Sequence, residues 1–125
     1  MKRHVITTTS DTTGAATVYT DDTVNGRILN FMLEFTSATT TADVTVTTRD
    51  TSQTILAVSN VTSPKTYAPR QTIHKSADGT ALVFSSTTGG SAAYDYIYAA
   101  NEQLKIVVAE VGDSKALRFC IITDG

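Results

Sequence analysis

The stretch Asn101–Thr123, NEQLKIVVAEVGDSKALRFCIIT, decides the fold class of this chain. Apolar side chains recur in it at every second residue, first at Leu104, Ile106 and Val108 and then at Leu117, Phe119 and Ile121. A period of two over such runs is the signature of a β-strand with one buried face. The short Gly-containing turn at Val111–Ser114 predicts that the two strands form an antiparallel hairpin.

The opposite faces of these two strands are also partly apolar, because they carry Val107, Ala109, Cys120 and Ile122. A strand that faced water on one side would show polar residues there. We therefore expect this pair to lie in the centre of the fold, covered on both sides or partly covered by another subunit.

Alternation extends over most of the remaining chain. It predicts strands at Lys2–Thr8, Ala15–Thr20, Arg27–Phe35, Ala42–Thr48 and Thr54–Val61, the last two as a hairpin. In the third of these, Leu29, Phe31, Leu33 and Phe35 share one face. The dipeptide Asn25-Gly26 predicts a tight turn before it.

The segment Ser63–Arg70 holds both prolines, which argues against a central strand there. Asp78-Gly79 predicts a hairpin joining Gln71–Lys75 to Thr80–Ser85. No segment keeps a 3.6-residue period, so we expect little or no helix. The prediction is a single domain, residues 1–125, folded as an antiparallel β-sandwich or small barrel, with the jelly roll as first choice. Residues 1–8 form an N-terminal arm or an edge strand.

Composition limits the classes of function. The chain has 125 residues with 41% apolar and 18% charged side chains, and a formal net charge of −2, which suit one globular domain. Its 10 basic residues are scattered among 12 acidic ones, whereas a nucleic-acid binder usually has a basic stripe. The charge distribution therefore argues against nucleic-acid binding. No run of 18 apolar residues occurs, so we expect no membrane-spanning segment, and we do not expect residues 1–7 to act as a secretory signal. The single cysteine, Cys120, excludes an internal disulfide and fits synthesis in the cytoplasm.

Residues able to do chemistry are few and scattered, so we expect no enzyme, no metal and no cofactor. His4 and His74 lie far apart in sequence, and a zinc site needs three or four ligands. Cys120 has apolar neighbours, as a buried inert thiol does. Asp11, Asp21 and Asp22 fit solvated turns better than a calcium loop, and Gly89-Gly90 lacks the Lys and helix of a phosphate loop.

Tyr94, Tyr96 and Tyr98 share one face of a predicted strand, with Asp95 and Ile97 on the other. Tyrosine is common at protein interfaces because its ring is apolar and its hydroxyl stays hydrogen-bonded. We interpret the row as the edge of the core or as a subunit interface, in preference to a sugar-stacking platform.

Tyr67-Ala68-Pro69-Arg70 is an extended segment in which Pro69 restricts the backbone. It presents a ring and a guanidinium, which suits anchoring to a partner. The alternative is that the segment leads into a strand and pairs Arg70 with a local carboxylate.

A series of motifs lies between Ala42 and Val111: Ala42-Asp43-Val44-Thr45-Val46-Thr47, Asp50, Ile55-Leu56, Tyr67–Arg70, a Gly/Ser-rich loop, Tyr96-Ile97-Tyr98 and Glu102–Val108. In this order the motifs resemble the small structural proteins encoded beside tailed-phage major capsid proteins. Ala68 stands where that family pattern has a second aromatic residue. The resemblance implies a head decoration, or cement, protein: a β-sandwich that forms a homotrimer on the capsid surface.

These observations lead to one functional expectation and one alternative. We expect a non-enzymatic virion protein, made in the host cytoplasm, that binds and stabilises the exterior of the assembled phage capsid. The major capsid protein would be its partner, and Tyr67, Arg70, Tyr94, Tyr96 and Tyr98 are the candidate partner-binding residues. The alternative is a carbohydrate- or receptor-binding module of a phage tail or surface appendage, which would use the tyrosine row.

Overall fold

The computed structural model describes residues 1–35, 41–72 and 94–125, and within these ranges the protein is all-β with no helix. Ten strands lie there: β1 (Lys2–Thr9), β2 (Ala16–Tyr19), β3 (Val24–Phe35), β4 (Ala42–Thr48), β5 (Thr54–Val61), β6 (Lys65–Tyr67), β7 (Arg70–Thr72), β8 (Tyr94–Glu102), β9 (Leu104–Ala109) and β10 (Ala116–Thr123). The described part of the chain contains no helix long and apolar enough to cross a membrane.

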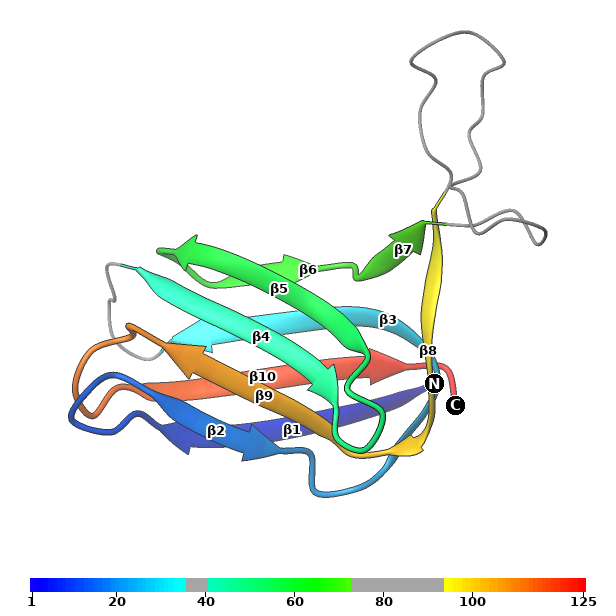
Figure 1. Cartoon of the computed structure of the whole chain (residues 1–125), viewed down its shortest axis with the longest axis horizontal. Helices are drawn as coiled ribbons and strands as arrows, with labels where there is room; N and C mark the ends of the chain where they lie inside the picture. The colour runs from blue at the N-terminus through cyan, green and yellow to red at the C-terminus, as the bar shows by residue number, and fades with distance from the viewer. Residues whose placement is uncertain (36–40, 73–93) are drawn as a thin grey trace, which may run out of the picture.

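The strands form two antiparallel sheets that pack as a sandwich, as the alternation predicted (Figure 1). One sheet has the order β1-β10-β3-β8-β7, with β6 paired to β3, and the other has the order β2-β9-β4-β5. At one end of the sandwich β8 runs steeply across the direction of the other strands, and both chain termini lie near it (Figure 1).

The core fills the space between the sheets with the apolar rows that the sequence displays. Its largest fully buried side chains include Phe31, Phe119, Leu33, Leu104, Ile106, Leu117 and Ile121. Phe31 and Phe119 come from neighbouring strands, with ring centroids 5.8 Å apart. Each such side chain contributes about 1.5–3 kcal/mol through removal from water. The two rows of the Asn101–Thr123 stretch are therefore core rows, as predicted.

The predicted hairpin of these two rows is wrong. β9 pairs with β2 and β4, whereas β10 pairs with β1 and β3 in the opposite sheet. Glu110, Gly112 and Ser114 adopt positive φ angles of 61°, 94° and 54° in the loop that carries the chain from one sheet to the other. Alternation reports which face of a strand is buried, and two strands that face each other across a core show the same pattern as a hairpin. Both strands are central, as expected from their partly apolar second faces.

The predicted turn at Asn25-Gly26 is also wrong, because both residues lie inside β3. The pairing of β3 with β8 shifts register between Val24 and Asn25, and Gly26 has a φ of +86°. The residue that this shift leaves without a partner is Asn101 of β8, which has a φ of 55°. A glycine can supply a positive φ inside a continuing strand as well as in a turn, and Gly26 does so here.

A second irregularity in β3 changes the predicted core row. Between Ile28 and Asn30 the pairing with β10 skips Leu29. As a result Ile28 is fully buried, while Leu29 is only partly so; Phe31 and Leu33 are buried as predicted. The row of inward residues changes parity at Leu29, and this places Arg27 on the outside.

The N-terminal residues form a docked edge strand, because β1 pairs with β10 over eight consecutive residues. The hairpin predicted for β4 and β5 is present. The proline-containing segment forms the short strands β6 and β7, which are not central. The loop predicted at Ser37–Thr41 lies outside the described residues except for Thr41, and the hairpin across Asp78-Gly79 lies outside them except for Gln71 and Thr72.

Candidate functional site

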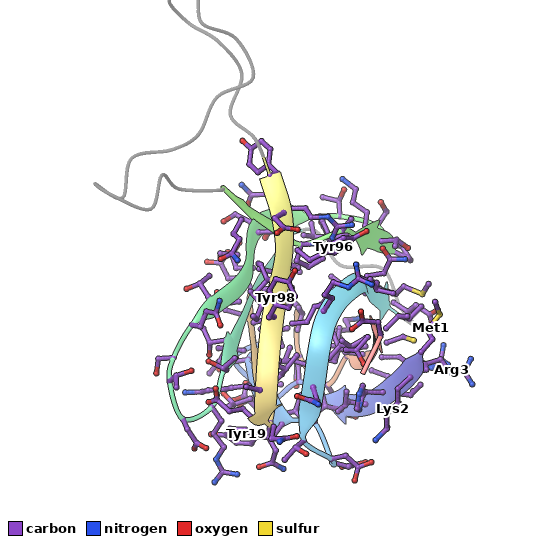
Figure 2. All side chains as sticks on the ribbon, turned by 90° about the vertical axis from the view of Figure 1, so that its right-hand side faces the viewer. Met1, Lys2, Arg3, Tyr19, Tyr96 and Tyr98 are labelled. Carbon is purple, nitrogen blue, oxygen red and sulfur yellow. The ribbon has the colours of Figure 1, made fainter. Side chains whose placement is uncertain are left out.

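The tyrosines of β8 form an outward row at the end of the sandwich (Figure 2). Tyr94 is 61% exposed and Tyr98 is 51% exposed, whereas Ile97 and Ala99 on the opposite side of the strand are buried. Tyr96 is half-buried between the two exposed tyrosines. Alternate residues of a strand point to opposite faces, so the three rings lie on one surface, as the sequence indicated.

Two arginines flank the central ring of this row. Arg70 on β7 lies directly opposite Tyr96 in the strand pairing, and its guanidinium is 4.1 Å from the ring centroid. Arg27 on β3, the strand on the other side of β8, has its guanidinium 5.0 Å from the same centroid. A cation over an aromatic face at this distance stabilises by about 0.5–1 kcal/mol at an exposed site. We call Tyr94, Tyr96, Tyr98, Arg27 and Arg70 the β8 strip.

Arg27 is held in place by Asp124 near the C-terminus. The backbone N–H of Arg27 donates to Asp124 Oδ1 at 2.6 Å, and its Nε donates to Oδ2 at 2.5 Å. The hydrogen bond from the Arg27 side chain is the main reason that the pKa of Asp124 lies below its ordinary value, and the same bond raises the pKa of Arg27. Sequence reasoning missed Arg27, because uninterrupted alternation put it in the same row as Phe31.

Arg70 is ordered by neutral oxygen atoms. Its Nη1 donates to the carbonyl of Pro69 at 2.7 Å and to the carbonyl of Leu29 at 3.3 Å. Among the described residues no ion pair involves Arg70, so the pairing with a local carboxylate that the sequence left open is not seen. The guanidinium therefore lies on the Tyr96 ring with its charge uncompensated by a nearby described carboxylate.

Tyr67 does not belong to the β8 strip. It pairs with Phe31 across β6 and β3, and it packs partly buried against the core. Directly opposed residues of an antiparallel pair lie on the same face of the sheet, so Tyr67 points inward with Phe31. Of the five predicted partner-binding residues, the structure brings together Arg70, Tyr94, Tyr96 and Tyr98.

A second pair of the same kind includes Tyr19, which lies near the lower end of β8 in Figure 2. Tyr19 on β2 is 36% exposed, and the Arg49 guanidinium lies 4.7 Å from its ring centroid. Arg49 Nη1 also donates to Gln103 Oε1 at 2.5 Å. Sequence reasoning missed this pair, because Tyr19 and Arg49 are 30 positions apart and only the pairing of β2 and β4 with β9 brings them together.

The corner between β8 and β9 fixes this end of the sandwich. The Glu102 carboxylate accepts hydrogen bonds from the backbone N–H groups of Asp50 and Thr51, at 2.8 and 2.9 Å, and from the Thr51 hydroxyl at 2.8 Å. These bonds, the Thr51 hydroxyl first, hold the pKa of Glu102 below its ordinary value. The Thr20 hydroxyl accepts from the Leu104 N–H at 3.1 Å, and it donates to the Asp22 carbonyl at 2.8 Å. These hydrogen bonds hold together the end of the sandwich that carries the tyrosines.

Histidine, cysteine and acidic residues do not gather into a metal site anywhere in residues 1–35, 41–72 and 94–125. Cys120 is buried, and Asp11 accepts hydrogen bonds inside its own turn, from Thr13 and Ala15. His74 and Gly89-Gly90 lie outside the described residues.

His4 is buried beside a pocket of about 120 Å³ that Asp21 and Asp22 also line. Its Nε2 atom has no hydrogen-bond partner among the described residues. Burial lowers the pKa of the His4 imidazole; Lys2 lowers it further and Asp22 opposes the change.

Comparisons of the chain with protein-family models, with curated proteins and with solved structures find no match.

Proposed function

We propose that this protein is a non-enzymatic structural component of a phage virion that binds the exterior of the assembled capsid and stabilises it. One observation carries the proposal: the β8 strip displays two exposed tyrosines beside a ring flanked by two arginines, on a rigid sheet. Tyr and Arg are enriched among the residues that dominate binding energy at protein interfaces. The capsid as partner rests on the motif resemblance between Ala42 and Val111.

Pre-organisation is the physical basis of the proposed binding. Tyr96, Arg27 and Arg70 already hold one another in place before any partner arrives. Ordering a flexible side chain at an interface costs about 0.5–1.5 kcal/mol, so side chains that are already ordered lose less on binding. Many copies attached to one shell would add the effect of repetition.

The strand order supports a further part of the proposal, a jelly-roll topology. The sheets β1-β10-β3-β8 and β2-β9-β4-β5 place successive long strands in opposite sheets, except for the hairpin of β4 and β5. Such alternation between the sheets supports an eight-stranded jelly roll, an architecture common in capsid and lectin domains. Amide NOEs between β10 and both β1 and β3, with none between β9 and β10, would be the expected NMR pattern; cross-strand NOEs within a β9–β10 pair would contradict it.

Sedimentation with undecorated phage heads tests the capsid proposal. Wild-type protein should pellet with the heads, and the double variant Y98A/R70A should bind at least tenfold more weakly. The matched control is Arg118→Ala, because Arg118 pairs with Glu34 on the outer sheet face away from the β8 strip. Wild-type protein that stays in the supernatant would refute the proposal. Equal loss of binding in the control would show that the β8 strip is not the binding surface.

The exposed rings of Tyr94 and Tyr98 favour one alternative, a carbohydrate-binding module. Tyr94 and Tyr98 are four residues apart on the strand, which separates their Cα atoms by about 13 Å, a span that one sugar chain can cover. A glycan array is the test. Binding that is lost in Tyr98→Ala, together with no binding to heads, would favour the carbohydrate module over the capsid protein.

A further inference from the structure

Among the described residues, the strands at the edges of the two sheets are β1, β2, β5, β6 and β7. An unprotected edge strand can pair with a strand of another molecule, so proteins usually make their edges short, bulged or proline-bounded. Four of these edges carry such protection. β2 has only four residues, and β6 and β7 have three each, beside Pro64 and Pro69. β5 has two register shifts with β4, each of which inserts an extra residue into β5.

β1 is the exception. It pairs with β10 over eight residues without a register shift, and it contains no proline. Its charged residues, Lys2 and Arg3, stand only at its beginning. The turn at Asp21–Asp22 lies beside the first half of β1: Lys2 reaches Asp22 at 3.9 Å, and residues 3–6 line a pocket of about 120 Å³ together with Asp21 and Asp22.

The outward row of β1 contains an exposed apolar residue. Val5 is 37% exposed, and it lies opposite Cys120 of β10 on the outer face of the sheet. Met1, at the start of β1, is 90% exposed beside Lys2 and Arg3 (Figure 2). A second strand added to this edge would cover Val5 and provide partners for the outer backbone groups of β1.

We infer that the free edge of β1 pairs with β1 of a second copy of this chain, antiparallel about a twofold axis, with Val5 opposite Val5. In this register Lys2 and Arg3 of one copy lie opposite Thr8 and Thr7 of the other, so no like charges meet. The two exposed valines contact each other at the axis. The sequence of β1 is thus self-complementary in the antiparallel direction, whereas parallel pairing would bring the basic ends together.

Disulfide trapping tests this register. Directly opposed residues of an antiparallel pair have Cα atoms about 4.5–5.5 Å apart, inside the range that a disulfide bridges. The variant V5C/C120A should therefore form a covalent dimer under mild oxidation; Cys120→Ala prevents a bond within one chain. The control T45C/C120A places an exposed cysteine on the central strand β4, and it should remain mostly monomeric on a non-reducing gel. Equal cross-linking of both variants, or none in V5C/C120A, would overturn the inference.

Sedimentation velocity without any cysteine substitution gives an independent measurement. The wild-type chain should show a species of twice 13.3 kDa. Val5→Lys should weaken its association at least tenfold, because two ammonium groups would meet at the axis, while Val5→Thr should change it less than threefold. A strict monomer, or a threefold assembly unaffected by Val5→Lys, would refute β1 pairing. The association of two copies through β1 is measured independently of binding to phage heads, because head binding is tested with variants of the β8 strip.

Discussion

Replacing Thr20 by Val removes one hydroxyl from the corner that supports β8. Thr20 is 1% exposed, and its Oγ1 accepts from the N–H of fully buried Leu104 and donates to the Asp22 carbonyl. Valine has nearly the same shape but can neither accept nor donate. The Leu104 N–H would be left without its partner, which costs about 1–3 kcal/mol, and the bond to Asp22 would add up to about 1 kcal/mol. We expect Thr20→Val to lower the free energy of unfolding by about 2–3 kcal/mol.

Thr20→Ser is the matched control, because serine keeps both hydrogen bonds and loses only a methyl group. That loss costs about 0.8 kcal/mol by transfer alone. Urea unfolding followed by circular dichroism measures both variants. With a slope of about 2 kcal/mol per molar urea, the valine variant should unfold at a midpoint about 1 M lower than wild type. A valine variant as stable as the serine variant would refute the assignment of this hydroxyl as the support of the corner.

Three other predictions concern stability. The pKa of His4 is lowered in the folded protein, so the unfolded chain binds more protons than the folded protein below about pH 6.5, and stability should fall from pH 7 to pH 5. In His4→Gln this part of the fall should disappear when urea unfolding is measured at each pH, and an unchanged pH profile would contradict the prediction. Gly26→Ala should lower the free energy of unfolding in urea by about 2 kcal/mol or more, because Gly26 has a φ of +86° and a Cβ there would lie 2.5 Å from Asp124 Oδ1. Gly112→Ala, at a φ of +94° but beside the flexible Lys115 side chain, should cost only about 1 kcal/mol in the same measurement, and equal losses would count against the Asp124 contact. Phe119→Ala should cost about 3–5 kcal/mol in urea unfolding, because the ring is fully buried against Phe31, and a loss below 1 kcal/mol would be incompatible with this core.

Local signals in the sequence were reliable for features that depend on one strand alone, such as which side chains share a face. They were unreliable for features that depend on how that strand pairs with its neighbours. The Asn25-Gly26 pair predicted a tight turn, but the pairing of β3 with β8 continues through both residues, and the positive φ of Gly26 lies inside the strand. The tyrosine row of β8 followed from alternation alone. Arg27 did not, because the skipped residue Leu29 changes the parity of β3, and only the register with β10 reveals it.

The sequence by itself determined that this protein is all-β, that its alternate apolar residues form a core, and that Tyr94, Tyr96 and Tyr98 share a face. A side chain's exposure depends on its own strand, and a period of two records that directly. Tertiary structure alone decided that β9 and β10 belong to opposite sheets, that Arg27 and Arg70 meet at Tyr96, and that Tyr67 points inward. Strand partners are chosen by hydrogen bonding between segments far apart in the chain, and the same alternation is compatible with many such choices.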